Sequence, residues 1–461
     1  MTPVNEAYRS LSFWHDTVPG PLDPRPPLPG DLDIDVAIIG AGYTGLWTAY
    51  HLARLDPSVR IVVLEREIAG FGASGRNGGW ALGEYGISPM AFAEASSPEL
   101  AVRQARALYD AIDDIGRVAD AEGIDCHYAK GGWVTWARNR AQLARVEAGV
   151  RARHDLGLTG DEVRLLGPDE ARGIGNASRV LGGKFFANVA AIHPSRLVRG
   201  LAEACEQLGV VVHEGTTCTG LEPGVVRTDR GTVRAEVIVR ATEGYTRDLA
   251  GHRRTLAPVY SLMVATAPLP DEVWAEIGLH RRPTFQDGRN LTIYGQRTAD
   301  GRFAFGGRGA PYRFGSRIDP AVERSGRIHD GLVETLRDLF PVLGDVEVTH
   351  RWGGVLGMPR DWSPSVRLDR QTGLATAGGY VGDGVAAAKL AGHTLAELIA
   401  DVESERTDLP WVGHESPRWE PEPLRWLGVN AGLRMAGAAD RAEDRRDRTT
   451  WHSAVLHRLV G

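Results

Sequence analysis

Apolar residues run without a break from Val36 to Ile39 and stop at three closely spaced glycines, Gly40, Gly42 and Gly45. Such a short apolar run next to glycines indicates a buried strand. Residues 43 to about 55 have helical spacing, and a second strand over 60–65, with the apolar run 61–64, follows the turn at Asp56-Pro57. This order predicts a βαβ unit with the glycines at the turn from the first strand into the helix.

The three glycines have separate roles in a turn of this kind. Gly40 lets the chain turn tightly, Gly42 lets the backbone approach a pyrophosphate, and Gly45 lets the helix pack close to the strand. The helix N-terminus then directs unpaired N–H groups at the phosphates. Glu65 ends the second strand, where a carboxylate can accept both hydroxyls of an adenosine ribose. An acidic residue there favours NAD or FAD over NADP.

The remaining patterns alternate between helix and strand. Helices are expected at 97–124 and 139–156 and in a segment that opens at 190–199, and strands at 131–136, 210–214, 217–221, 260–266, 291–296 and 302–307. Six prolines between Val18 and Gly30 predict an extended arm over the surface. Near the C-terminus a helix is expected to end at about Arg441, and the charged run 440–448 is interpreted as solvated surface.

A second glycine-rich stretch favours FAD over NAD as the expected cofactor. It is Ala69-Gly-Phe-Gly-Ala-Ser-Gly-Arg-Asn-Gly-Gly79, followed by Trp80. So few side chains argue against an ordinary helix or strand and favour backbone wrapped around a large, flat, polar ligand. Here the chain resembles the D-amino-acid oxidase superfamily of FAD enzymes, in which such a loop runs past the pyrophosphate to the isoalloxazine. The residue sequence of this loop, Gly72 to Gly79, is most similar to that of the gamma-glutamylputrescine oxidase branch.

Two later segments carry the same resemblance. Residues 237–245 are a strand leading into a small-residue turn, which in the family returns to the adenosine and pyrophosphate. Residues 375–385 and the following helix resemble the C-terminal flavin motif, whose helix N-terminus can present N–H groups to the flavin. The resemblance spans roughly residues 30 to 400. It implies these FAD-binding residues: Gly40, Gly42, Tyr43, Thr44, Gly45, Glu65, Arg66, Gly72, Ala73, Ser74, Arg76, Asn77, Gly78, Gly79, Trp80, Cys218, Ala241, Thr242, Gly353, Gly379, Tyr380, Gly382, Gly384 and Val385.

The expected fold class is α/β, with a discontinuous, Rossmann-like FAD-binding domain of the glutathione-reductase type and an α+β substrate domain built on an antiparallel sheet. Interleaved domains are a trait of the family, and 461 residues exceed the usual size of a single core. We expect a cofactor domain of 31–96, 160–250 and 345–405 and a substrate domain of 97–159 and 251–344. Residues 1–30 are then the N-terminal arm and 406–461 a C-terminal extension.

Composition and charge limit the classes of binding partner that are expected. The net charge is −6 and no basic tract suggests nucleic acid or an anionic membrane. The N-terminus lacks the parts of a signal peptide and the apolar runs are strand-sized, so a soluble, cytoplasmic protein is expected. The three cysteines are not spaced like metal ligands, and their odd number is consistent with reduced thiols. The histidines, notably His193, His213, His350 and His393, are not spaced like ligands, so no metal is expected.

Catalysis is expected to come from the flavin, because the residues form no convincing catalytic set of their own. A flavin amine oxidase passes hydride from the carbon bearing a neutral amine to N5, and water hydrolyses the resulting iminium. An aromatic wall would hold the C–H bond and desolvate the ammonium. The substrate-pocket candidates are Trp80, Tyr260, Arg308, Trp352 and Tyr380. Core packing explains Tyr260 about as well and Trp352 only slightly less well, and an arginine such as Arg308 is more often a surface residue.

Three departures from related subgroups bear on the chemistry. Monomeric sarcosine oxidases hold the substrate carboxylate with a lysine where this chain has Val385 to Ala388, so a simple N-methyl amino acid is less favoured. A second family lysine, tied to oxygen, would fall near 303–306, where none occurs, so oxygen or another acceptor stays open. Neither 75–79 nor 353–360 contains a cysteine or histidine for covalent attachment, so non-covalent FAD is expected.

The sequence thus predicts an FAD-dependent enzyme that oxidises a primary or secondary amine, a small molecule, to an imine. Three alternatives stay open. The first is a flavin dehydrogenase of a hydroxy acid or alcohol, which would need a base near N5. The second is a flavoprotein that binds FAD without turnover. The third, an NAD-dependent dehydrogenase, leaves the second glycine loop and the C-terminal motif unexplained. Neither the particular amine nor the oligomeric state follows from one sequence.

Overall fold

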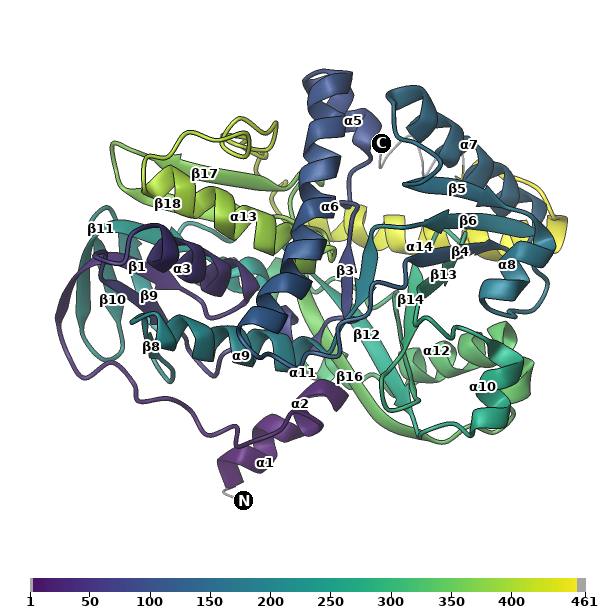
Figure 1. The fold of residues 1–461 in the computed structure, drawn as a ribbon, viewed down its shortest axis with the longest axis horizontal. Coiled ribbons are helices and arrows are strands. Elements are labelled where there is room, and N and C mark those ends of the chain that lie inside the picture. Colours follow the sequence, from purple (N-terminus) through teal and green to yellow (C-terminus); the bar gives the residue numbers. More distant parts are fainter. Residues whose placement is uncertain (1–2, 454–461) are drawn as a thin grey trace.

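The computed structural model describes residues 3–453 and contains two eight-stranded sheets side by side (Figure 1). The first sheet has the order β17-β18-β11-β1-β2-β8, with the hairpin β9–β10 attached to β11. Its central pairs, β11–β1–β2–β8 and β11–β18, are parallel. The strands are β1 Leu32–Ile39, β2 Ile61–Leu64, β8 Val211–His213, β9 Cys218–Glu222, β10 Val225–Thr228, β11 Thr232–Arg240, β17 Ser365–Asp369 and β18 Leu374–Gly378.

Helices cover one face of this sheet, and the apolar end of β1 and all of β2 are buried beneath them. α3 Tyr43–Leu55 packs between α9 Pro194–Gln207 and α13 Gly384–Ile399, and α6 Pro98–Ala121 packs on α13 (Figure 1). Their buried residues form one apolar cluster with β1 and β2. Gly392 of α13 lies so close to α3 that a Cβ would stand 2.6 Å from Trp47. The expected βαβ unit is therefore present, with the helix at the expected residues.

The second sheet has the order β16-β12-β15-β14-β13-β4-β6-β5, and all its pairs are antiparallel except β13–β4. A small third sheet pairs β3 with β7. The strands are β3 Trp80–Leu82, β4 Trp133–Ala137, β5 Val163–Leu166, β6 Gly182–Phe186, β7 Val189–Ala191, β12 Ala257–Thr266, β13 Thr284–Asp287, β14 Ile293–Arg297, β15 Phe303–Arg308 and β16 Val348–Met358. The helices of this half are α5 Pro89–Ala95, α7 Arg140–Leu156, α8 Pro168–Ile174, α10 Asp271–Ile277, α11 Pro320–Glu323 and α12 Gly326–Leu339.

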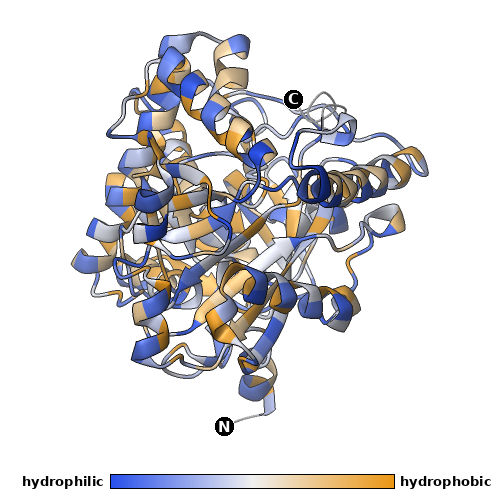
Figure 2. Cartoon of the chain, turned by 90° about the vertical axis from the view of Figure 1, so that its right-hand side faces the viewer, coloured by the Kyte–Doolittle hydropathy of each residue, from blue (hydrophilic) through white to orange (hydrophobic). Residues whose placement is uncertain are grey.

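This architecture confirms the expected fold class, a parallel Rossmann-like sheet beside a mostly antiparallel one. In Figure 2 the inner strands carry many apolar residues, and the surrounding helices alternate between hydrophilic and hydrophobic positions. Among the residues that the structure describes, no helix is both long and apolar enough to cross a membrane.

Two of the expected domain boundaries need correction. β6 pairs with β4, β5 pairs with β6, and β16 pairs with β12 along its length, so all three belong to the second sheet. The boundaries at 160 and 345 had placed these strands with the cofactor sheet. The sequence patterns predicted no strand in these three segments, and strand partners depend on contacts distant in sequence. We keep the division into a cofactor and a substrate domain as a proposal, with these strands moved to the substrate domain.

The N-terminal segment is more structured than the expected arm. Residues 21–29 are extended, as predicted, but α1 Pro3–Arg9 and α2 Phe13–Asp16 precede them. Phe13 and Trp14 are buried against Trp352 of the second sheet, and the Trp14 indole donates to the Asn77 carbonyl at 2.8 Å. The segment therefore buttresses the glycine loop instead of lying on the surface. Residues 1–2 of the expected arm, and 454–461 of the C-terminal extension, lie outside the described part.

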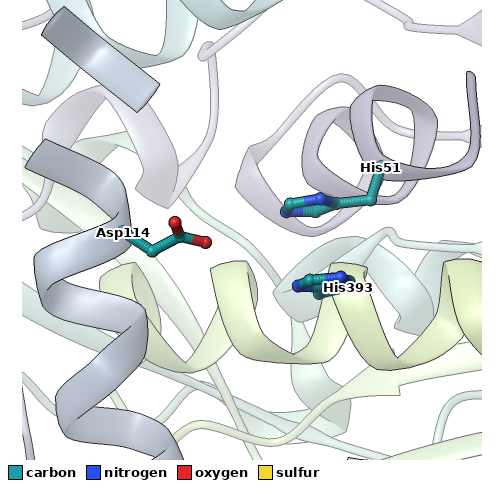
Figure 3. Close-up of side chains that lie close together, drawn as sticks. All are labelled: His51, Asp114 and His393. Atoms are coloured by element: carbon teal, nitrogen blue, oxygen red, sulfur yellow. The ribbon is translucent and has the colours of Figure 1, made fainter. Parts of the chain in front are cut away.

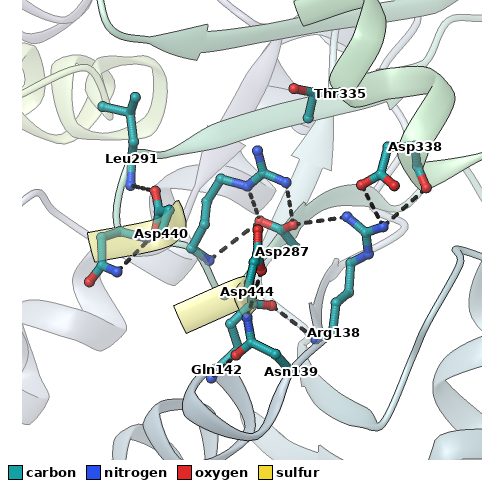
Figure 4. Close-up of polar contacts among 12 residues, drawn as sticks. Arg138, Asn139, Gln142, Asp287, Leu291, Thr335, Asp338, Asp440 and Asp444 are labelled. Carbon is teal, nitrogen blue, oxygen red and sulfur yellow. Dashed lines mark hydrogen bonds and ion pairs between the residues drawn. The ribbon is translucent and has the colours of Figure 1, made fainter. Parts of the chain in front are cut away.

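The C-terminal helix α14, Leu424–Arg446, contradicts part of the interpretation of 440–448 as solvated surface: Asp440 and Glu443 are held by the second sheet, whereas Arg441 and residues 444–448 are exposed. Asp440 accepts hydrogen bonds from the backbone N–H groups of Leu291 (Figure 4) and Asn290. Glu443 pairs with Arg145. Asp444 accepts from the Asn139 amide. Residues 440, 443 and 444 share one helical face, which docks on the second sheet beside the Arg138–Asp287 pair.

Candidate functional site

One cavity, of about 1290 Å³ with its open mouth included, lies where the first sheet meets the glycine loop, β16 and α13. Seventeen of the expected FAD-binding residues line it. They are Gly40, Gly42, Tyr43, Thr44, Glu65, Arg66, Gly72, Ala73, Ser74, Asn77, Cys218, Ala241, Thr242, Tyr380, Gly382, Gly384 and Val385. The remaining seven do not: Gly45, Arg76, Gly78, Gly79, Trp80, Gly353 and Gly379.

The turn after β1 has the geometry that its glycines predict. Gly40 has a φ of +106°, and a Cβ there would lie 2.6 Å from the Ala241 carbonyl oxygen. Gly45 faces back to the strand, where a Cβ would lie 2.0 Å from the Gly40 oxygen, which explains why it does not line the cavity. Gly42 is the N-cap of α3 and has no side chain to cover the helix N-terminus. That N-terminus therefore faces the cavity, as an anion site requires.

Glu65 lies just beyond β2, on the cavity wall. Its carboxylate accepts from the backbone N–H groups of Ala41, at 2.9 Å, and Glu67, at 3.0 Å. Burial raises the pKa of Glu65, and these two hydrogen bonds oppose that shift. A carboxylate has about four lone-pair positions, so about two stay available for ribose hydroxyls.

The second glycine loop is built differently from the expectation. It contains a one-turn helix, α4 Ala73–Arg76, although helix had been excluded there. Several of its glycines are needed for contact with protein: a Cβ at Gly70 would lie 2.3 Å from Val198, and one at Gly79 2.1 Å from Gln296. Glycine content alone therefore does not show whether a glycine is needed for a close contact with protein or with a ligand. Its first half lines the cavity, whereas Gly78, Gly79 and Trp80 turn towards the second sheet.

Arg76 does not point at the cavity. Its buried guanidinium donates to the Glu323 carboxylate at 2.7 Å and to the Tyr245 hydroxyl at 3.0 Å, and it stacks on Phe71. The Trp352 indole in turn donates to the Arg76 carbonyl. Gly353 also faces Glu323. Arg76 and Gly353 thus pack between the glycine loop, α11 and β16 and do not line the cavity, and their FAD contacts stay a prediction.

The C-terminal motif brings α13 to the cavity. Asp383 is its N-cap, and Gly384 and Val385, the first residues of the helix, line the wall. The Tyr380 hydroxyl lies 3.1 Å from the Thr44 hydroxyl, so the two helix N-termini are joined across the cavity. Gly379 instead packs against Ser363.

The substrate-pocket candidates separate into two groups. Tyr260 and Trp352 are buried in apolar clusters, which supports the packing interpretation for both. Tyr380 is on the cofactor cavity wall. Trp80 and Arg308 lie where the glycine loop, the second sheet and α13 meet: the Trp80 ring centre is 6.0 Å from that of Tyr294, and Arg308 donates to the Val381 carbonyl at 2.6 Å.

Sequence reasoning missed the polar wall residues Thr216, Thr217, Tyr245 and Asp248, and with them Glu243. Glu243 follows the selected Ala241 and Thr242 in the same turn, so its position was the only available signal. Its carboxylate accepts from the Gly357 N–H at 2.8 Å. Burial raises the pKa of Glu243 to about 7, and the backbone hydrogen bonds of Gly357 and Gly244 oppose the shift. Glu243 therefore changes charge near neutral pH.

This raised pKa predicts a pH-dependent stability. The folded protein binds the Glu243 proton more tightly than the unfolded chain does, so the stabilisation is complete below the ordinary value of 4.5 and is lost as the pH rises through about 7. We expect Glu243→Gln to remove this loss, so that the variant gains about 2–3 kcal/mol relative to the parent between pH 5 and 8. Thermal unfolding of both proteins across this range measures the difference. The exposed Glu334→Gln is the control, and equal pH slopes in parent and Glu243→Gln would contradict the assignment.

His51, His393 and Asp114 form a cluster that their sequence spacing does not reveal. They come from α3, α13 and α6, and their ligand atoms lie within 4.8 Å of one another (Figure 3). The imidazoles stack with centres 4.0 Å apart, and burial lowers the pKa of His393 to about 4. The Lys389 ammonium pairs with the Asp114 carboxylate and supplies a positive charge at this point. The cluster thus joins three helices as an ion-pair contact, and none of its residues lines the cofactor cavity.

Comparisons with known proteins agree with this geometry. The family model described as FAD dependent oxidoreductase matches residues 35–398. A probable oxidoreductase OrdL of Rhizobium meliloti is 31% identical over 421 residues, covering 88% of this chain and 91% of that protein. The gamma-glutamylputrescine oxidoreductase of Escherichia coli is 30% identical, covering 81% of this chain and 85% of its own length. The glycine oxidase of Geobacillus kaustophilus superposes with a TM-score of 0.68 at 21% identity, covering 83% of this chain and 99% of that one.

Proposed function

The chain belongs to the family of FAD-dependent oxidoreductases, and from this premise we propose that it oxidises a primary or secondary amine to an imine, which water then hydrolyses. The single observation that carries the proposal is the joint lining of one cavity by the glycine turn, Glu65, the glycine loop and the N-terminus of α13. The similar gamma-glutamylputrescine oxidoreductase supports an amine as substrate.

The residues fit FAD. A Cβ at Gly42 would stand 2.9 Å from the Ser74 hydroxyl, so the narrow approach between α3 and the glycine loop exists only with glycine. We propose that Gly40 to Thr44 hold the pyrophosphate, that Glu65 holds the ribose, and that Gly384 and Val385 present N–H groups to the ring system. We also propose non-covalent binding, because within residues 3–453 no histidine lines the cavity and the cysteine that does, Cys218, is on β9 near Glu65.

The chemistry that FAD supplies when bound is acceptance of a hydride equivalent from the carbon next to nitrogen. The chain's own residues then have to bind the amine, exclude water and remove the ammonium proton. Trp80 and Tyr294 present an aromatic surface at the junction of the two sheets, where an alkyl chain can pack. No lysine of the described chain lines the cofactor cavity, so the electron acceptor, oxygen or another, is left for experiment.

Product analysis tests the proposal. Purified protein is incubated with polyamines, N-alkyl amino acids, aminophosphonates and hydroxy acids, each with oxygen and with an artificial electron acceptor. We expect release of ammonia or a smaller amine, together with a carbonyl product, from at least one amine. Turnover of hydroxy acids alone would favour the hydroxy-acid dehydrogenase, and FAD-loaded protein that turns over nothing would favour a flavin-binding protein without catalysis.

A further inference from the structure

Asp383 is placed at a helix N-terminus but does not cap it. Aspartate is among the best N-cap residues because its carboxylate accepts from the first free N–H groups. Asp383 occupies the N-cap of α13, with φ −99° and ψ 41°, and its side chain makes no capping hydrogen bond. The first N–H groups of the helix thus stay open to the cofactor cavity, and the carboxylate is directed elsewhere.

That carboxylate has no partner in the described chain. No donor of residues 3–453 hydrogen-bonds to it and no cation forms an ion pair with it, although Asp383 keeps only part of its surface accessible. Burial raises the pKa of Asp383 to about 7, against the opposing charge of Arg308. An unpaired carboxylate in such surroundings is costly unless a ligand completes it.

The neighbours of Asp383 come from several elements at the junction of the sheets. Arg308 of β15 and Glu84, which follows β3, act on its charge, and its charge in turn acts on Tyr294 of β14. Arg308 is anchored through the Val381 carbonyl. The Tyr294 ring lies against the end of the glycine loop, where a Cβ built on Gly78 would stand 2.7 Å from it. The Tyr294 hydroxyl hydrogen-bonds with the Ser261 hydroxyl at 2.7 Å. Asp383 thus lies between two glycines of the cofactor cavity wall, Gly382 and Gly384, and a Cβ at Gly382 would stand 3.3 Å from the Arg308 guanidinium.

Glu84, the other carboxylate nearby, differs in one decisive way. It pairs with Arg153 and lies 3.9 Å from the Lys184 ammonium. Burial would raise the pKa of Glu84, but these two cations outweigh burial and lower it. Its charge is therefore already balanced by the protein, whereas that of Asp383 is not.

We propose that Asp383 binds the ammonium group of the substrate and accepts its proton, an inference that rests on the proposed amine oxidation. In this step an N–H bond of the ammonium breaks, an O–H bond forms on the carboxyl, and the nitrogen keeps its lone pair as a neutral amine. The substrate class is then an alkylammonium that enters protonated, with its carbon chain against Trp80 and Tyr294. A pKa near neutrality suits a group that gains and releases this proton.

Binding of a non-oxidisable amine tests the proposal apart from turnover. tert-Butylammonium has no hydrogen on the carbon that bears nitrogen, and pivalate is its anionic counterpart of similar shape. Each is titrated into the FAD-loaded protein at constant ionic strength, and binding is followed by calorimetry and by the perturbed flavin absorbance. We expect the parent to bind tert-butylammonium and not pivalate, and Asp383→Asn to bind the ammonium at least about tenfold more weakly, with unchanged FAD content.

Two further variants complete the test. Asp383→Glu keeps the charge and should recover part of the affinity. Asp345→Asn, on a fully exposed aspartate, should behave as the parent does. For an amine that is turned over, we expect the kcat/KM profile of the parent to have an acid limb near pH 7, and Asp383→Asn to displace it.

The outcomes separate this inference from the proposed function. Unchanged ammonium affinity and an unchanged acid limb in Asp383→Asn would overturn the role of Asp383, even if amines are oxidised. Preference of the parent for pivalate would overturn it as well. Ammonium binding that depends on Asp383, together with no oxidation of any amine, would instead overturn the proposed function and leave the binding role intact.

Discussion

Gly42→Val is expected to give a folded, colourless protein. Gly42 has a φ of −86°, which valine adopts without strain, so the backbone itself does not forbid the substitution. The new side chain would project between the N-terminus of α3 and Ser74, where a Cβ alone already stands 2.9 Å from the hydroxyl. Its methyl groups would then occupy the approach that we assign to the pyrophosphate.

We expect the FAD affinity of this variant to fall at least about a hundredfold, a loss of about 3 kcal/mol. The flavin absorbance per chain, after dialysis and reloading with FAD, measures the loss, and circular dichroism reports whether the fold is kept. Gly428→Val is the matched control, because Gly428 lies on the exposed side of α14 with open space around its Cα. Full FAD content in a folded Gly42→Val protein would place the pyrophosphate elsewhere.

Arg76→Met is expected to destabilise the protein strongly and to spare the FAD site. The Arg76 guanidinium is 2% exposed and is the cation closest to the Glu323 carboxylate, at 2.7 Å. Methionine keeps the stacking on Phe71 but leaves the Glu323 charge without its partner and the Tyr245 hydroxyl without its donor. Removing one member of a buried ion pair costs about 3–5 kcal/mol.

A double-mutant cycle identifies the cause of that loss. Glu323→Leu removes the carboxylate left behind, so the double variant Arg76→Met, Glu323→Leu should be more stable than Arg76→Met alone. Chemical denaturation of the four proteins gives the coupling energy. If Arg76→Met unfolds as the parent does but loses FAD, the contact with Glu323 is unimportant and the original expectation of a cofactor contact is restored.

The sequence was most informative where a local pattern and a local structure coincide. The apolar strand, the three glycines and the helix from Tyr43 to Leu55 are consecutive in the chain, and the structure has all of them at the expected residues. The acidic end of β2 and the α13 motif likewise reach the cavity wall. Each of these features depends on few residues, so their spacing is enough to place them.

Features that depend on distant contacts were missed or misassigned. The second half of the glycine loop needs glycine to fit Gln296 and Tyr294, which the loop's own sequence cannot show. The partner of β16 is β12, about ninety residues earlier, and no pattern within β16 selects it. The acidic face of α14 could have been predicted. Acidic residues at 440, 443 and 444 share one helical face, a pattern that the interpretation of 440–448 as a charged, solvated run did not take into account.

The central claim is that electrons pass from an amine to FAD held in the cavity between α3, the glycine loop and α13. Anaerobic titration of the purified protein with amines, while the flavin band near about 450 nm is recorded, tests it most directly. The account predicts bleaching by at least one primary or secondary amine in the parent, and no flavin band to bleach in Gly42→Val. A yellow parent protein that is bleached only by hydroxy acids, or by no compound tested, would contradict it.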